Sequence, residues 1–121
     1  MNVHKLDGFN KIYEVECFQE EFEKTVSETK PNGRYHKWLR TKLMQLDELG
    51  HLALKLRDFE PIKDTDPRLY AIRYPRSQKN PRVVYVYIEN DKICLLHTFN
   101  EKSTSDYNSA IKIAQNRTKS L

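Results

Sequence analysis

The run of six residues from Val83 to Ile88 constrains the fold more than any other part of this 121-residue chain. Every side chain in it is a valine, a tyrosine or an isoleucine, residue types that favour β-structure. A strand formed by this run is apolar on both of its faces, so neither face can be left to solvent. We therefore expect this strand at the centre of a sheet.

Three other runs also have the composition or the period of a strand. Leu69–Tyr74 precedes the central run, and Lys92–Phe99 follows it after a short polar turn. Near the N-terminus, Ile12–Cys17 alternates apolar residues with Glu14 and Glu16. This alternation predicts a strand with one buried face and one solvated face that carries the two glutamates.

Apolar residues at helical spacing predict three helices. The first follows the N-terminal strand directly and ends before Pro31, the second stops at Gly50, and the third begins in the cap-forming residues 103–105. Residues 51–67 are hard to assign, because Pro61 and Pro67 limit any regular element. The three apolar stripes are Phe18, Phe22 and Val26; Tyr35, Trp38, Leu39, Leu43 and Leu46; and Tyr107, Ala110, Ile111 and Ala114.

The resulting order, β-α-α-β-β-β-α, predicts an α+β fold in one domain over residues 1–121. We expect an antiparallel sheet of about four strands, two N-terminal helices packed on one of its faces, and a C-terminal helix. Residues 1–10 are expected to form an N-terminal extension. The predicted core includes Leu39, Leu43, Val84, Val86 and Leu96.

The net charge of +4 is concentrated in the second half of the chain. Residues 61–121 hold eleven Lys and Arg against six Asp and Glu, and no acid lies between Pro67 and Ile88. This asymmetry favours a polyanionic partner, although a solvated basic loop is the alternative. The cations in the acid-free stretch are Arg68, Arg73, Arg76, Lys79 and Arg82.

Several classes of protein are disfavoured by what the sequence lacks. It contains no apolar run of the ~20 residues that a membrane span needs and no stretch of signal-peptide type, so we expect a soluble, cytoplasmic protein without a membrane partner. Its four histidines lack the spacing of metal ligands, and there is no CxxC, HExxH, P-loop or dinucleotide fingerprint. We therefore expect no metal and no cofactor, and any catalysis would be metal-free.

The segment from Leu69 to Ala114 resembles the C-terminal half of RelE/ParE-superfamily toxins, and in particular their phage-related HigB/Gp49-like branch. The resemblance rests on four motifs: Leu69–Arg73, the strand-opening Arg82, Leu95–Phe99, and Lys102–Thr104. It extends over roughly residues 11–117 through the order of the elements.

This resemblance implies a toxin of a type II toxin–antitoxin system, which in the best-studied members is a ribosome-dependent mRNA endoribonuclease (an mRNA interferase). Its partners would be messenger RNA, the ribosome and a co-encoded antitoxin of helix-turn-helix type. Members similar to ParE instead bind DNA gyrase, and other relatives are phage-derived binding proteins without toxicity. In this branch the turn before the last helix usually reads phenylalanine-x-lysine-lysine. Here Glu101 replaces one of the two lysines, and an acid near a phosphate site opposes the charge of the substrate.

Metal-free cleavage of RNA needs a base for the 2′-hydroxyl, cations for the charged phosphorane and an acid for the leaving oxygen. Arg82 is the strongest candidate cation, because a guanidinium at the start of the central strand can hold a phosphate through two donors. The alternative for Arg82 is a surface residue at a strand end. Lys102 lies near the N–H groups that open the last helix, and is either a phosphate ligand or a solvated lysine.

Tyr107 corresponds to a tyrosine that the resemblance assigns to proton transfer or stacking, but its place on an apolar stripe also fits a core anchor. His97 is a candidate acid or base, although a lone histidine among apolar neighbours is commonly a core residue with satisfied hydrogen bonds. Arg73 is equally compatible with a structural ion pair. The candidate RNA-binding residues are Arg68, Arg73, Arg76 and Lys79, and Tyr70, Tyr74, Tyr85 and Tyr87 are candidates for stacking on bases.

Overall fold

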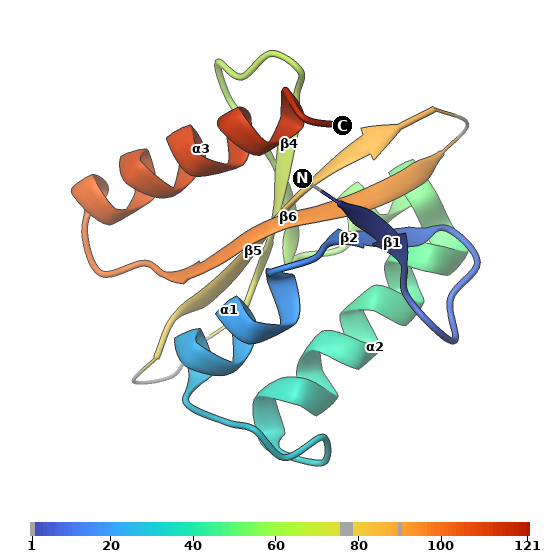
Figure 1. Ribbon diagram of the computed structural model, residues 1–121, viewed down its shortest axis with the longest axis vertical. Coiled ribbons are helices and arrows are strands. Elements are labelled where there is room, and N and C mark those ends of the chain that lie inside the picture. Colours follow the sequence, from blue (N-terminus) through green and yellow to red (C-terminus); the bar gives the residue numbers. More distant parts are fainter. Residues whose placement is uncertain (1, 76–78, 90) are drawn as a thin grey trace.

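The computed structural model describes residues 2–75, 79–89 and 91–121, and over these residues the chain forms a six-stranded sheet (Figure 1). The strand order across the sheet is β1-β2-β6-β5-β4-β3. The strands are β1 (Val3–Lys5), β2 (Ile12–Val15), β3 (Phe59–Ile62), β4 (Leu69–Arg73), β5 (Pro81–Ile88) and β6 (Lys92–Asn100).

Strand β5 lies between β4 and β6, as its two apolar faces predict. Its residues from Pro81 to Val86 are all buried. The predicted core is confirmed, because each of the five residues named from the sequence is at most 4% exposed. These residues are Leu39, Leu43, Val84, Val86 and Leu96.

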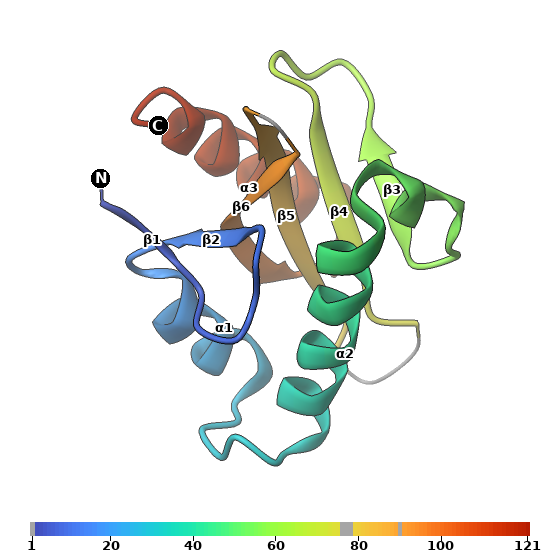
Figure 2. The same cartoon turned by 90° about the vertical axis from the view of Figure 1, so that its right-hand side faces the viewer.

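The helices cover the two sides of the sheet (Figures 1 and 2). Helix α1 (Phe18–Val26) and helix α2 (Arg34–Leu49) lie on one side, and helix α3 (Thr104–Thr118) lies on the other. Helix α3 begins as predicted, since the Ser103 hydroxyl accepts a hydrogen bond from the Asp106 amide at 3.1 Å. The α+β class and the C-terminal helix are therefore confirmed.

The predicted sheet of about four antiparallel strands was wrong in number and in direction. Residues 1–10 are not merely an extension, because β1 pairs antiparallel with β2. Strand β3 lies in the segment expected to be irregular; it contains Pro61, which an edge strand tolerates because one side of its backbone needs no ladder partner. Strand β2 pairs in parallel with β6.

The solvated face predicted for the strand at Ile12–Cys17 was wrong at Glu14, whereas Glu16 is exposed as predicted. Glu14 is only 1% exposed, because strand β1 and helix α1 contribute side chains that cover it. His4 Nε2 lies 3.0 Å from one carboxylate oxygen, and Gln19 Nε2 donates to the other at 2.8 Å. His4 and Gln19 therefore satisfy the Glu14 carboxylate in place of the solvent expected for a polar face.

The arrangement of the helices differs in detail from two helices packed on one face. Helix α1 lies close to β6. Helix α2 instead lies close to a short 3₁₀ helix, η1 (Gly50–Lys55), which follows it in the chain. Helix α2 reaches the sheet through longer side chains, including Trp38, whose ring lies edge-on to Tyr74 with centroids 5.1 Å apart. The two N-terminal helices therefore contact the sheet in different ways, and the short η1 follows α2 directly.

The start of α2 is held by a carboxylate from the preceding loop. Glu28 accepts hydrogen bonds from the backbone amides of Tyr35 at 3.3 Å and His36 at 2.8 Å, and it pairs with the His36 ring at 2.7 Å. Burial opposes ionisation of Glu28, but these bonds outweigh it and lower its pKa. A methyl group on Gly33 would lie 2.1 Å from the carboxyl carbon of Glu28, so a glycine leaves the space that this cap needs.

The adjacent residues Leu43 and Met44 test this packing of α2. Leu43 is 3% exposed and Met44 is 58% exposed. We expect Leu43→Ala to lower the free energy of unfolding by about 2–5 kcal/mol, since it leaves a cavity in the core. Met44→Ala should change it by less than about 0.5 kcal/mol. Urea unfolding followed by circular dichroism measures both, and equal effects would contradict the burial of Leu43.

Candidate functional site

The register of three neighbouring strands places several candidate residues on one face of the sheet. Arg73 of β4 is paired with Arg82 of β5, which is paired with Phe99 of β6. Directly paired residues in antiparallel strands point to the same face, so these side chains form a row across the sheet. Helix α3 packs close to β5 and β6 on this side. We call this side the α3 face.

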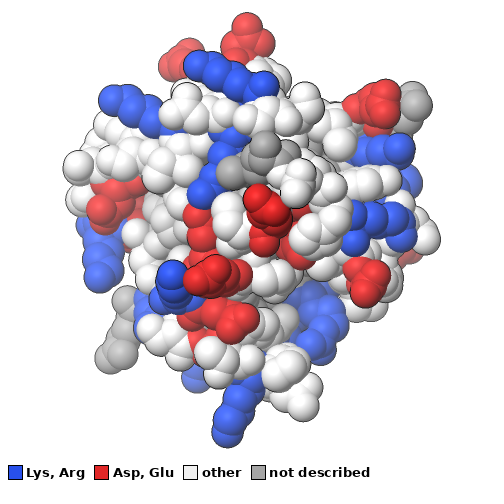
Figure 3. Space-filling view, in the orientation of Figure 1, with Lys and Arg blue, Asp and Glu red and all other residues white. Residues whose placement is uncertain are grey.

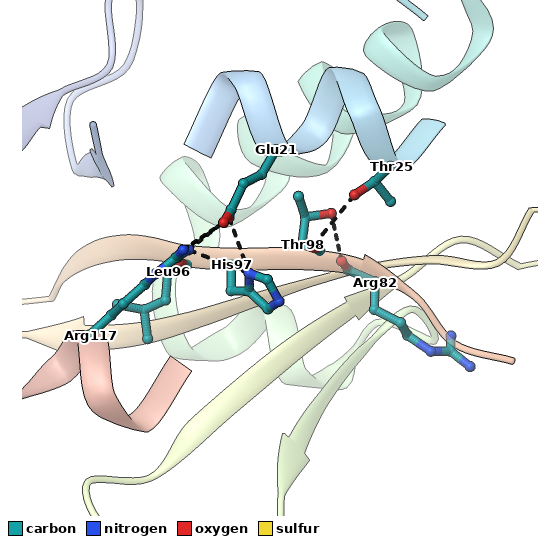
Figure 4. Close-up of polar contacts among 7 residues, drawn as sticks. All are labelled: Glu21, Thr25, Arg82, Leu96, His97, Thr98 and Arg117. Carbon is teal, nitrogen blue, oxygen red and sulfur yellow. Dashed lines mark hydrogen bonds and ion pairs between the residues drawn. The ribbon is translucent and has the colours of Figure 1, made fainter. Parts of the chain in front are cut away.

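Arg82 is a buried arginine with a carboxylate partner. Its residue is 7% exposed, and its Nε donates to Glu101 Oε1 at 2.9 Å. Its backbone is fixed as well, since the Thr98 hydroxyl donates to the Arg82 carbonyl at 2.8 Å (Figure 4). Among the described residues, no other charged side chain lies within ion-pair distance of Arg82. The strongest candidate from the sequence is therefore paired with the acid that departs from the family motif.

A second arginine–glutamate pair lies on the same face. Arg73 Nη1 lies 3.3 Å from Glu60 Oε2, and both side chains are nearly half exposed. Glu60 belongs to β3, the strand that the sequence did not predict. The structural ion pair that was one of two readings of Arg73 is thus present in the structure.

Tyr107 of α3 lies within the electrostatic influence of both pairs. Burial and the charges of Glu60 and Glu101 raise the pKa of its phenol, against a smaller lowering by Arg82. The phenol is therefore protonated at neutral pH, and it can donate a proton to a reacting group more readily than it can accept one. Its half-buried ring also packs against the core, so both readings of Tyr107 from the sequence remain compatible with its position.

An open groove of about 680 Å³ runs between β3 with the turn after it and helix α3. Tyr107 and Glu60 both line it, so solvent and a ligand can reach them from the same side. The groove also has cations in its walls, Lys63 and Lys112. Its other lining residues are Pro61, Ile62, Asp64, Thr65, Asn108, Ile111 and Gln115.

His97 is held in a network that joins three elements (Figure 4). Its Nδ1 lies 3.1 Å from Glu21 Oε1 of α1 and 3.4 Å from Arg117 Nη1 of α3. Arg117 binds Glu21 through two nitrogens, at 2.7 and 2.5 Å, and also donates to the Leu96 carbonyl at 2.7 Å. At 9% exposure, His97 is a nearly buried residue with satisfied partners as well as a candidate acid or base.

The remaining basic candidates differ in their surroundings. Lys79 Nζ donates a hydrogen bond to the Val26 carbonyl at the end of α1 at 2.6 Å, so its ammonium group is already bound within the protein. Lys102 and Arg68 are exposed, and Arg76 lies outside the described residues. On the face shown in Figure 3, blue and red side chains are interspersed rather than separated. The excess of cations in the sequence therefore does not form a continuous basic patch on that face.

Three of the four tyrosines proposed for stacking contact one another, and the fourth, Tyr74, packs against Tyr35 and Trp38. Tyr70 stacks on Tyr85 with ring centroids 5.5 Å apart, and Tyr87 lies edge-on to both. Burial is the main cause of the raised pKa values of Tyr85 and Tyr87. These rings point to the face opposite Arg82, because alternate residues of β5 point to opposite faces.

The sequence analysis did not identify three charged residues that contact residues of the α3 face or of β6. Glu60 lies in a strand of four residues that contains a proline, and so gave no periodic signal. Glu21 and Arg117 are ordinary helix charges in sequence, and their pairing across 96 positions is visible only in the structure. The sequence signal that could have identified this pair is Arg117, the basic residue in the last turn of the final helix.

The described part of the chain holds no group of three or more His, Cys, Asp or Glu side chains placed to bind a metal ion. Within the same residues, none of the helices combines the length and apolar character that crossing a bilayer requires.

Residues 36–119 match the model of a family described as phage-derived, Gp49-like proteins. The matched span begins within α2 and includes β3 to β6 and all of α3, and with them Glu60, Arg82, Glu101 and Tyr107. No curated protein matches the chain.

The network around Glu21 predicts a stability that depends on pH. Burial opposes ionisation of Glu21, but the hydrogen bonds from Arg117 and His97 outweigh it and lower the pKa from 4.5 to about 2. A carboxyl whose pKa is lower in the folded state contributes stability above its unfolded pKa, and this is lost as the pH falls from about 5 toward 2. We expect Glu21→Gln to destabilise the protein at pH 7 by on the order of 1–3 kcal/mol and to flatten this acid dependence.

Urea unfolding between pH 3 and pH 7 measures the effect. Glu20→Gln is the matched control, because Glu20 is exposed and pairs only with the exposed Lys24 of the next helical turn among the described residues. Parallel pH curves for the wild type and Glu21→Gln would show that Glu21 is not the titrating group.

Proposed function

Because the match covers more than half of its length, the chain belongs to the Gp49-like family of phage-derived proteins, within the RelE/HigB-type toxin superfamily, and we propose that it is the toxin of a type II toxin–antitoxin system. Within that superfamily we place it with the HigB-like, ribosome-dependent mRNA endoribonucleases. The observation that carries the proposal is the row of Arg73 and Arg82 on the α3 face, where Glu60, the ion-pair partner of Arg73, lines the same groove as Tyr107.

In this proposal Arg82 holds the scissile phosphate and stabilises the charge that develops on it. Its Nε is bonded to Glu101, and its two Nη groups have no hydrogen-bond partner among the described residues. A guanidinium can therefore bind a phosphate through both Nη groups without first releasing the carboxylate. Lys102, exposed at the turn before α3, and Arg68 would contact neighbouring phosphates of the messenger RNA.

The proposed partners are the ribosome with its messenger RNA and a co-encoded antitoxin of helix-turn-helix type. We propose that the antitoxin covers the surface formed by residues 68–82 and α3. The half of the chain that contains both is the basic half, so an acidic segment of the antitoxin would complement its charge and accelerate association. Such a segment would also block access to Tyr107.

The Arg82–Glu101 pair favours a second candidate function. The Glu101 carboxylate, which is bonded to Arg82, opposes the approach of a phosphate. A protein without nuclease activity would tolerate this repulsion. The second candidate is therefore a toxin that binds a protein target, as ParE-like proteins bind DNA gyrase, or a phage-derived binding protein without toxicity. Cut transcripts after expression distinguish the nuclease from both.

We expect expression of the wild-type protein in bacteria to arrest growth and to produce cleaved messenger RNA, and Arg82→Ala to relieve the arrest. Losing one cation that stabilises a transition state commonly lowers the rate ~10²–10³-fold. Since Arg82 is buried, Arg82→Lys serves as a second variant that keeps the charge and removes the planar fork. Arg57→Ala, at an exposed arginine, is the control.

Growth curves, mapped transcript ends and thermal unfolding of each variant measure these outcomes. A wild-type protein that neither slows growth nor cuts transcripts would contradict the nuclease function. Relief of the arrest by Arg57→Ala as well would remove the special role of Arg82.

Tyr107→Phe separates the two readings of this tyrosine, because it keeps the ring and removes the hydroxyl. We expect this variant to unfold at the wild-type temperature and to lose toxicity, since proton donation commonly contributes ~10²–10⁴-fold in rate. Growth curves and thermal unfolding measure both properties. Full toxicity of Tyr107→Phe would make Tyr107 a core anchor and leave His97 as the candidate for proton transfer.

A further inference from the structure

We propose that Glu101 is a positioning residue of the proposed nuclease, which orients the guanidinium of Arg82 toward the scissile phosphate and thereby raises the rate of cleavage. The inference rests on the proposed function and assigns a role to the residue by which this chain departs from the family motif. The charge of Glu101 opposes the phosphate, whereas its contact with Arg82 assists the reaction.

Glu101 binds Arg82 at the one nitrogen that the phosphate does not need. The Arg82 Nε donates to Glu101 Oε1 at 2.9 Å, and the Arg82 side chain is 8% exposed whereas that of Glu101 is 31% exposed. A guanidinium has five N–H donors in a planar fork, and four of them belong to the two Nη groups. Since neither Nη group has a hydrogen-bond partner among the described residues, this edge of the fork is left for two phosphate oxygens.

Glu101 is itself held by the segment that carries Arg82. Its backbone N–H donates to the Asn80 carbonyl at 3.1 Å, and its own carbonyl accepts from Asn80 Nδ2 at 3.3 Å. Asn80 directly precedes β5, and Arg82 is the second residue of that strand. On the strand that leads to Glu101, the Thr98 hydroxyl donates to the Arg82 carbonyl at 2.8 Å (Figure 4). The backbones of the two residues are therefore fixed relative to each other, so their ion pair restricts the direction of the guanidinium.

The lysine that is usual in the motif would not have this function in this chain. Its ammonium group would lie beside a guanidinium that is almost buried, where like charges repel more strongly than in water. The Arg82 Nε–H would also lose its acceptor, and no other charged side chain of the described residues lies within ion-pair distance of Arg82. The buried arginine and the acid at position 101 therefore depend on each other.

The proposal separates two effects of one carboxylate. The negative charge of Glu101 weakens the attraction for the RNA backbone and so lowers the affinity. Its hydrogen bond fixes the cation that stabilises the phosphorane, which raises the rate at which bound RNA is cleaved. A lysine at position 101 should therefore tighten binding and slow cleavage.

The test measures single-turnover cleavage on ribosomes carrying messenger RNA over a range of toxin concentrations, which separates the maximal rate from the half-saturating concentration. We expect Glu101→Lys and Glu101→Ala to lower the maximal rate by about 10²-fold, as a misplaced group commonly does, without raising the half-saturating concentration. Glu101→Gln retains an oxygen that accepts from Nε–H, and its maximal rate should stay within about tenfold of the wild type. Glu89→Lys makes the same change of charge at an exposed residue beyond the far end of β5, and should leave the maximal rate unchanged.

A double-mutant cycle tests whether Glu101 acts through Arg82. In the Arg82→Ala background, Glu101→Ala should cause no further loss of rate, because the group that Glu101 positions is absent. The double variant also lacks the buried guanidinium that Glu101→Ala alone leaves without its carboxylate partner. Thermal unfolding of each variant ensures that the rates compare folded proteins.

Three results would overturn the proposal while the nuclease function stands. The first is a maximal rate of Glu101→Lys and Glu101→Ala that equals or exceeds that of the wild type. The second is a loss confined to the half-saturating concentration, which would make Glu101 a binding residue. The third is a further loss of the same size when Glu101→Ala is added to Arg82→Ala. If the wild type does not cleave messenger RNA on ribosomes, the proposed function fails and this inference fails with it.

Discussion

Burial of both faces of β5 is the constraint on which the rest of the structure depends. Six of its residues in succession are buried, so helices must cover the sheet on each side. Helices α1 and α2 meet that need on one side and α3 meets it on the other (Figure 2). The candidate site follows from this arrangement, because Arg82 opens β5 on the face that α3 covers, and α3 brings Tyr107 to the same place.

The position of α3 depends on polar contacts as well as on its apolar surface, which includes Tyr107 and Ile111 packed against the core. Ala110 and Ala114 are its only fully buried residues among those described, and small side chains contribute little hydrophobic free energy. Arg117, near the other end of the helix, compensates by binding Glu21 and the Leu96 carbonyl. The helix is therefore anchored at its C-terminal end and capped by Ser103 at its N-terminal end, so that Tyr107 in its first turns has a defined position above the sheet.

The sequence predicted the elements that have a strong period or a strong composition. Four strands, three helices and the buried residues of α2 and β5 follow from the apolar pattern, as does the cap of α3. It did not predict β1 or β3, because strands of three and four residues carry too few side chains for a period to be recognised. The burial of Glu14 depends on His4 and Gln19, which reach it from other elements. Only part of the site was predicted from the sequence. Arg82 and Tyr107 lie in recognisable motifs, whereas Glu60 lies in β3, which is too short to be recognised.

The effect of Glu101 on the site depends on its contacts in the folded protein. In the sequence, an acid in a turn that is usually basic argues against binding phosphate. In the structure it bonds the Nε of a buried arginine, and an unpaired guanidinium at that depth would be costly. The same carboxylate therefore stabilises the folded state and restricts the orientation of Arg82 through its Nε. The arginine is thus held in place before any substrate arrives, which is the condition under which a cation stabilises a transition state most effectively. In the proposed nuclease, the nearby charges of Arg82 and Glu101 would weaken the attraction for free RNA, and a substrate delivered by a larger partner such as the ribosome would suit this site better than one captured from solution.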